Sequence, residues 1–510
     1  MRRESFVKNA GRVSFGTMLS RILGYIRDML TADLFGAGMF ADAFYAAFRI
    51  PNLFRRIFGE GSFSAAFIPV FSGYLHTESK DEVQKFLNAV FTILVFTLLA
   101  LSFLGVLFAP FLVKIMVWGF SDSSEKIQLT IELARLLFPF ILFVCLAAFL
   151  LAVLNTLQSF FIPAAAPAVL NFSEIIYMLA VAPALICQNQ IKGLAVSVVA
   201  GGALYFLVQY PKLKSLGWRL KFTLDLKHAG INKIVLLMVP SLIGLSVEQI
   251  NTFVDNICAS FLPSGSITAL YYSNRLMQLP LAVFGLAFAS VSLPLMSKAY
   301  AEKDMSDLKK SLSYSVRFTN FAMLPAAAGL MSIGLPIIKI LFEHGHFTYA
   351  ASILTNNALF YYSLGLPAYA GSRIFANAFY SFQDTKTPVK AAVWAMMLHI
   401  ILCVVLMRPM GAGGLAFATA LSSYFNFAVL AVYLKKRVNG IGVKLMCFSF
   451  CKSLIASVAS AAAAFNICTI EGNLLVSVPS AVVAGIAVFV VSAYILRSEE
   501  LKTFINICMR

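Results

Sequence analysis

Long uninterrupted apolar runs constrain the fold of this chain more than any other feature of its sequence. Residues 91–111 and 138–154 are two such runs, and neither contains a charged residue. A helix of about 20 apolar residues crosses the hydrocarbon core of a bilayer. Because that core offers no water to the backbone, helices with internal hydrogen bonds are the expected solution. The short segments of alternating polarity typical of a membrane β-barrel are not seen. The sequence therefore predicts an all-α integral membrane protein.

The charge content supports this class of protein. Only 12% of the 510 residues are charged, whereas soluble domains carry about 25%. A net charge of +17 would suggest nucleic-acid binding in a soluble protein, but Lys and Arg also gather in the cytoplasmic loops of membrane proteins. We therefore expect contact with membrane lipids and no nucleic acid. The first long segment carries Arg21, Arg27 and Asp28, so it does not resemble the apolar core of a cleavable signal peptide.

The connections between apolar segments alternate in charge. Residues 36–38 and 263–266 are poor in cations, whereas 212–227 and 435–437 are rich in Lys and Arg. By the positive-inside rule, both chain termini and the basic connections face the cytoplasm. We expect about fourteen spanning segments, centred near residues 22, 55, 100, 140, 172, 200, 247, 285, 325, 365, 398, 423, 455 and 484.

The sequence also contains a weak internal repeat, which indicates two similar lobes. At an offset of 225 residues, the pair Gln158 and Pro163 matches Gln383 and Pro388. Both copies hold six expected helices and begin on the same side, so a pseudo-two-fold axis along the membrane normal would relate them. We expect an N-lobe at 1–222, a C-lobe at 223–438, and two further helices with a cytoplasmic tail at 439–510. A second set of matches supports the repeat at an offset of 226: Tyr45 with Tyr271, Arg49 with Arg275, and 58–59 with 284–285.

Charged residues inside apolar segments mark the expected functional site. Each costs about 2.5–3.5 kcal/mol on membrane-insertion scales, so such side chains face a cavity or a partner. Asp42, Arg49 and Arg56 are spaced by seven and share one stripe of a helix. Pro51, Gly59 and Gly61 can break the same helix and act as a hinge. The remaining candidates are Arg21, Arg27 and Asp28 in the first segment, Arg55 in the second, and Arg275 and Arg373 in the C-lobe.

Two interpretations of these charges are open. In the structural one, acids neutralise arginines, for example Asp28 with Arg27 and Asp42 with Arg49, and Arg56 lies at the membrane surface. In the functional one, the excess of arginines lines a water-filled cavity between the lobes. Guanidinium groups pair bidentately with phosphate oxygens, so the expected ligand is a phosphate or diphosphate.

Catalytic and cofactor motifs are not found. The sequence lacks a Walker loop, a GxSxG motif, an HExxH motif and the cysteine spacing of a zinc site. We therefore expect a transporter and not an enzyme, with no cofactor. Driving force would come from the membrane potential, a monovalent cation or the substrate gradient. Asp255 could serve a cation site, or it could be a paired structural acid.

Several motifs together resemble one known family. Residues 20–28 (SRILGYIRD), 51–56 (PNLFRR), 271–276 (YYSNRL) and 383–390 (QDTKTPVK) are similar to the MurJ (MviN) family of lipid II flippases. This family belongs to the multidrug/oligosaccharidyl-lipid/polysaccharide exporter superfamily. The resemblance covers essentially the whole chain, and the motif in the first segment is long and specific.

The resemblance implies a function and a set of residues. The implied activity is alternating-access transport of lipid II, which is undecaprenyl-diphosphate bearing the peptidoglycan disaccharide-pentapeptide, from the inner to the outer leaflet of the bacterial cytoplasmic membrane. Cell-wall synthesis proteins are possible partners by the same resemblance. Asn274 replaces an acid that some relatives carry, and the segment 440–497 corresponds to helices that form a groove for the lipid tail. The implied substrate-binding residues are Arg21, Arg27, Asp28, Asp42, Arg49, Arg55, Thr268, Arg275 and Arg373.

Three other functions make different sequence predictions. A flippase for another lipid-linked oligosaccharide would have a similar basic cavity but lack the motif at 20–28. A drug/cation antiporter of the same superfamily would have an acidic or neutral cavity. A membrane enzyme acting on polyprenyl phosphates would need clustered acids to hold a metal, and none is evident.

Overall fold

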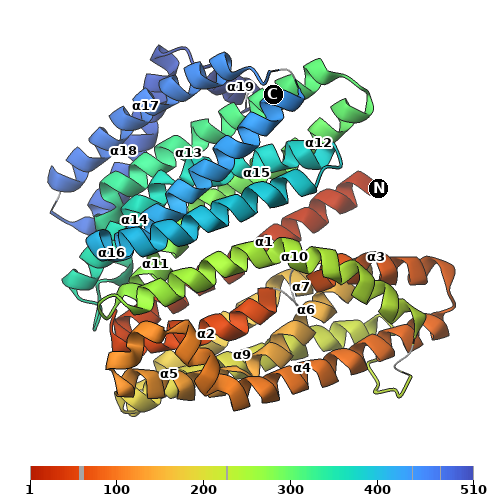
Figure 1. Cartoon of the computed structure of the whole chain (residues 1–510). Helices are drawn as coiled ribbons and strands as arrows, with labels where there is room; N and C mark the ends of the chain where they lie inside the picture. Colours follow the sequence, from red (N-terminus) through yellow and green to blue (C-terminus); the bar gives the residue numbers. More distant parts are fainter. Residues whose placement is uncertain (1, 57–61, 226–227, 439, 471, 509–510) are drawn as a thin grey trace. The chain divides into compact units, whose positions relative to one another are not determined.

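The computed structural model describes residues 2–56, 62–225, 228–438, 440–470 and 472–508. All regular structure in these ranges is helical, with no β-strand among them (Figure 1). The predicted all-α class is therefore confirmed. The chain divides into two compact units, Met1–Ser264 and Gly265–Arg510.

The first unit contains ten α-helices and three short 3₁₀ or π segments among its described residues. Its longest helices, α4 and α1, contain 37 and 34 residues. The elements are α1 (Arg2–Phe35), α2 (Met39–Phe54), α3 (Ser62–Thr77), α4 (Lys80–Met116), η2 (Trp118–Asp122), α5 (Ser124–Leu137), α6 (Phe140–Thr156), α7 (Phe161–Ala165), α8 (Pro167–Ile176), η3 (Tyr177–Val181), η4 (Ala182–Ala184), α9 (Cys187–Ser215) and α10 (Ala229–Ser260).

The described regular structure of the second unit is also helical, and the unit ends in a short helix. A π-helical turn, η5, joins α11 to α12. The elements are α11 (Ser266–Pro280), η5 (Leu281–Gly285), α12 (Leu286–Ala301), α13 (Met305–Phe342), α14 (Tyr349–Leu364), α15 (Leu366–Ser381), α16 (Lys386–Arg437), α17 (Val443–Ile470), α18 (Leu474–Ile495) and α19 (Glu499–Cys508).

Nine helical stretches of the described residues are long and apolar enough to cross a membrane. One of them, α16, contains 52 residues and bends at Gly411, whose φ is 59°. It therefore supplies both segments that the sequence centres near 398 and 423. Helix α1 carries Arg21, Arg27 and Asp28, which lower its apolar character. The fold is that of a multi-pass membrane protein, and the number fourteen stays a prediction.

Aromatic rings fill the core of the first unit. Phe67 on α3 stacks on Phe71 at a centroid distance of 5.1 Å and meets Phe149 of α6 edge-on at 5.4 Å. Phe86 of α4 completes the group, and none of the four side chains is exposed. In the second unit, α12, α13, α15 and α16 share a core formed by Met296, Leu312, Phe375, Phe379 and Leu434.

The segment after α9 runs along α4 in an extended conformation. Four residues of an α-helix rise about 6.0 Å, and two residues of extended chain rise about 6.6–6.8 Å. Side chains four apart on α4 can therefore bind alternate backbone N–H groups of the extended segment. The three pairs are Arg219 N with Gln84 Oε1 at 3.2 Å, Lys221 N with Asn88 Oδ1 at 3.1 Å, and Thr223 N with Thr92 Oγ1 at 3.1 Å.

Local geometry recurs at the offset of the sequence repeat. Gln158 and Gln383, which are 225 residues apart, both have a φ of 59°, a conformation uncommon for non-glycine residues. The next residue in each copy bonds a carbonyl five positions back: Ser159 N to Leu154 O at 2.8 Å, and Asp384 N to Phe379 O at 3.0 Å. The two turns are thus built alike.

The compact units do not divide where the repeat does. Helix α10 packs on α3 and α4 of the first unit, whereas the repeat starts its second copy near residue 223. The division into compact units does not test the boundaries of the repeat. The boundaries 1–222, 223–438 and 439–510 therefore stay a prediction.

Candidate functional site

Arg27 lies at the centre of a network between α1 and α8. Its guanidinium donates to Asp28 Oδ1 from Nη2 at 2.7 Å and from Nε at 3.1 Å. Nη1 lies 3.1 Å from Asn171 Oδ1 and 3.4 Å from Glu174 Oε1. The Arg27 side chain keeps 14% of its surface exposed, whereas Asp28 keeps 1%. Arg27 therefore contacts two acids. The structural interpretation expects the contact with Asp28 but not the one with Glu174.

Sequence reasoning did not identify Glu174 or Asn171. Both are buried on α8, and Asn171 also donates from Nδ2 to the Ser20 carbonyl of α1 at 3.0 Å. Glu174 is an acid within an apolar segment, so the reasoning that selected Arg27 would also have selected it. Asn171 is neutral, and no pattern in the sequence distinguishes it.

Asp42, near the start of α2, pairs with Lys126 in the first turn of α5. Lys126 Nζ lies 2.9 Å from Asp42 Oδ2 and 3.4 Å from Ser264 Oγ. It also lies 4.0 Å from the centre of the Phe120 ring. Asp42 therefore forms an ion pair with Lys126, a residue that sequence reasoning missed. Eighty-four residues separate the two partners, so no local pattern connects them.

The other cations near α2 lie in its second half, at Arg49, and just after its end, at Arg55 and Arg56. Arg49 donates from Nη1 to the Thr252 carbonyl of α10 at 3.1 Å, and Arg55 donates from Nε to Asn52 Oδ1 at 2.8 Å. Arg55 and Arg56 are both half-buried, so burial alone does not separate their roles.

The hinge residues and Arg21 complete the first unit. Pro51 is buried inside α2, three residues before the helix ends at Phe54. The predicted hinge residues Gly59 and Gly61 lie outside the described residues. Arg21 is exposed on α1.

Three predicted residues belong to the second unit. Thr268 and Arg275 both lie on α11, seven residues apart and thus on one stripe. Thr268 is fully buried, whereas Arg275 is half-buried. Arg373 is exposed on α15. The two positions on α11 correspond to Asp42 and Arg49 at the offset of 226.

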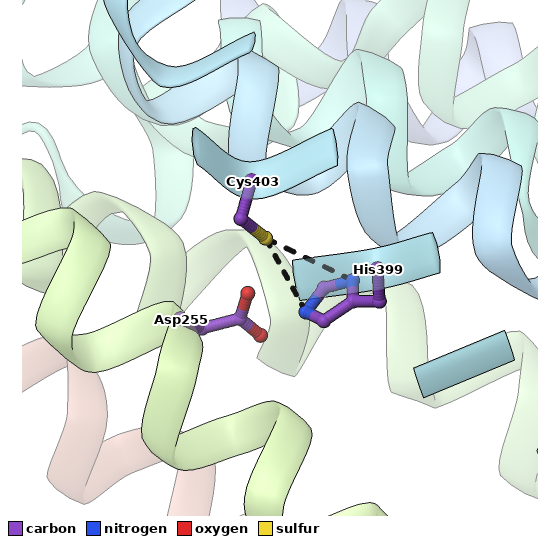
Figure 2. Close-up of side chains that lie close together, drawn as sticks. All are labelled: Asp255, His399 and Cys403. Carbon is purple, nitrogen blue, oxygen red and sulfur yellow. Dashed lines mark hydrogen bonds between the residues drawn. The ribbon is translucent and has the colours of Figure 1, made fainter. Parts of the chain in front are cut away.

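Figure 2 shows a buried His–Cys contact on α16. Cys403 Sγ lies 3.4 Å from Nε2 of His399, one helical turn earlier. Asp255, drawn in the same figure, lies on α10 in the first unit. Its role in binding a cation stays a prediction.

These features define a class of protein. Apolar helices long enough to cross a bilayer, with buried acids and cations between them, are typical of an integral membrane transporter. The particular family follows from comparison with known proteins. The sequence profile of the family described as "Lipid II flippase MurJ" matches residues 31–484, and the chain belongs to this family.

Curated relatives match over most of their length. A protein named "Probable lipid II flippase MurJ" from Buchnera aphidicola subsp. Schizaphis graminum is 34% identical over 457 residues, covering 89% of this chain and 88% of that one. "Lipid II flippase MurJ" from Burkholderia cenocepacia is 34% identical over 429 residues, covering 83% of each. The chain is accordingly a multi-pass protein of the inner membrane and a transporter.

Solved structures agree with the fold. The structure "Lipid II flippase MurJ, inward closed conformation" is similar with a TM-score of 0.80 and 29% identity, over 98% of this chain and 99% of that one. An inward-facing multidrug transporter of the MATE family and MOP superfamily has a TM-score of 0.67 at 13% identity, covering 84% of this chain and 98% of that one. The second likeness concerns the fold alone.

Proposed function

We propose that this chain is a lipid II flippase, which moves the undecaprenyl-diphosphate-linked peptidoglycan precursor from the inner to the outer leaflet. The family match over residues 31–484 carries the proposal, because it includes nearly all the helices. The relatives named above have lipid II in their printed names. This function would supply the precursor for peptidoglycan synthesis and so support wall growth and cell shape.

The arginines supply the chemistry that a diphosphate needs. Arg21, Arg27, Arg55 and Arg275 would contact its oxygens, since each guanidinium offers five N–H donors in a planar fork. Arg27 donates to Asp28, so a bound diphosphate would have to share or replace that contact. Asp28 would then position Arg27 instead of touching the substrate.

The transport cycle we propose is alternating access with both termini in the cytoplasm. The basic connections at 212–227 and 435–437 support this orientation. We further propose coupling to the membrane potential or to a monovalent cation, since the sequence offers no nucleotide-binding motif. A reporter active only in the periplasm, fused after Arg510, should remain silent; a strong signal would contradict the orientation.

Depletion of the protein tests the function directly. Cells in which the chain is the sole flippase should accumulate lipid II that an externally added lipid II-degrading enzyme cannot reach. Expression of the wild-type chain should restore access, whereas a variant with Arg21→Ala and Arg275→Ala should not. Normal access of the enzyme to lipid II in depleted cells would disprove the proposal.

A further inference from the structure

The first unit contains a hollow beside the turn that precedes α7. Its volume is about 340 Å³, and it lies between residues 157–162, which form this turn and the start of α7, and the end of α9. Five apolar side chains line it together with Gln158, Ser159 and Lys212. Lys212 is the one charged lining residue and is half-buried.

The second unit fills the corresponding position with its own carboxylate. Asp384 and Arg437 are the repeat counterparts of Ser159 and Lys212 at the offset of 225. Asp384 accepts hydrogen bonds from the Thr387 backbone N–H at 3.0 Å and the Thr387 hydroxyl at 2.8 Å. Arg437 donates to it from Nη1 at 2.6 Å. The cation at the end of α16 is therefore neutralised within the chain.

The first unit has the cation, Lys212, but carries Ser159 at the position that Asp384 occupies in the second unit. The turn is otherwise the same, because Gln158 and Gln383 share their positive φ. Among the described residues, no carboxylate lies within salt-bridge distance of Lys212. The cation of a half-buried lysine beside an open volume favours an anion from outside the chain.

We propose that this hollow binds the phosphate group of an anionic phospholipid. Lys212 contacts the phosphate in the place that the Asp384 carboxylate occupies in the second unit, and Ser159 donates its hydroxyl. The apolar lining, which includes Leu157, Phe161 and Leu216, covers the glycerol and the first methylenes of the acyl chains. Free inorganic phosphate would leave that lining unused, so an amphiphile is the better fit. The site is separate from the one proposed for the transported lipid.

The test compares variants of the full-length protein in nanodiscs or in detergent. The probes are phosphatidylglycerol, phosphatidylcholine and inorganic phosphate, and native mass spectrometry counts retained lipids. The wild-type chain should retain phosphatidylglycerol over phosphatidylcholine. Lys212→Ala should weaken that retention about tenfold, as expected for loss of one charge-assisted contact.

Ser159→Asp is the second variant, because it introduces the carboxylate that the second unit already carries at this position. It should fold with an unchanged or higher melting temperature and should lose selective retention of phosphatidylglycerol. Lys214→Ala is the matched control, since Lys214 is exposed on the same helix and does not line the hollow. It should retain the lipid as the wild-type chain does.

Three results would overturn the inference. The first is unchanged selective retention in a folded Ser159→Asp variant. The second is an equal loss with Lys214→Ala and Lys212→Ala, which would indicate attraction to the general positive charge of the surface. The third is binding of inorganic phosphate without retention of phosphatidylglycerol, which would show that the site takes the free ion instead of a lipid.

Discussion

Lys126 and Asp42 form a buried ion pair that has no counterpart in the second copy of the repeat. The two side chains keep 9% and 2% of their surface exposed. Ser123 and Thr348, 225 residues apart, cap α5 and α14 in the same way, so Ala351 takes the position of Lys126. Thr268 takes that of Asp42. The first unit therefore has an ion pair where the second has two neutral residues.

Removing one partner of this pair should destabilise the protein. Asp42→Ala or Lys126→Ala breaks this buried ion pair, which costs about 3–5 kcal/mol. The double variant Asp42→Ala, Lys126→Ala should recover much of that loss, because neither charge remains. Thermal unfolding in detergent measures the effect, and strictly additive losses would contradict direct coupling.

Activity of the same double variant separates two roles of Asp42. If the carboxylate only neutralises Lys126, the folded double variant should support growth after depletion of the wild-type chain. If Asp42 contacts the substrate, the double variant should fold but fail to support growth. Asp42→Thr with Lys126→Ala is the best-matched double variant, since it introduces the residue types of Thr268 and Ala351, the counterparts in the second unit.

The network around Arg27 gives a second prediction. Arg27 contacts Asp28 and Glu174, both of which are buried. Arg27→Ala should therefore lower stability as well as activity. Adding Asp28→Ala and Glu174→Gln removes the two acids that contact Arg27 and should restore accumulation in the membrane. Activity should remain lost if Arg27 binds the diphosphate, and growth at normal expression would instead assign Arg27 a structural role.

The remaining arginines give the third prediction. Arg21→Ala, Arg55→Ala and Arg275→Ala should each abolish support of wall synthesis while the protein still accumulates. Losing one charge-assisted contact costs about 1.5–3 kcal/mol, or roughly tenfold to a hundredfold in affinity. Replacement by Lys should rescue poorly, since an ammonium group lacks the planar fork. Arg56→Ala is the control and should be milder; equal defects at 55 and 56 would argue against a specific role for Arg55.

The sequence predicted properties that depend on local patterns. Apolar runs gave the all-helical membrane class, and the matching turns at Gln158 and Gln383 share a backbone conformation. Partners of buried charges depend instead on packing between distant segments. Lys126 and Glu174 approach α2 and α1 only after the helices pack, so spacing along the chain could not show that they pair with Asp42 and Arg27.

The C-terminal helix gives the fourth prediction, which concerns pH. Arg317 of α13 lies 2.6 Å from Glu499 and 2.5 Å from Glu500 of α19. Glu500 also accepts from Ser449 at 2.7 Å and Ser498 at 2.6 Å. Burial would raise the pKa of Glu500, but the two hydroxyl groups and the Arg317 guanidinium outweigh burial and hold this pKa below its usual range.

The pKa of Glu500 is lowered when α19 is docked on α13, and this shift determines the direction of the pH effect. The free carboxyl of a Glu has a pKa of about 4.3, so docking of α19 is fully stabilised above that pH and weakens as pH falls through the lower, docked pKa. Limited proteolysis should find α19 protected at pH 7 and cleaved faster in acid below about pH 4. Glu500→Gln should increase cleavage at pH 7 and flatten this pH dependence. Glu499→Gln is the matched control, because Glu499 is 68% exposed and exposed pairs contribute about 0–1 kcal/mol. Equal effects of the two variants would show that the buried carboxylate is not what holds α19 in place.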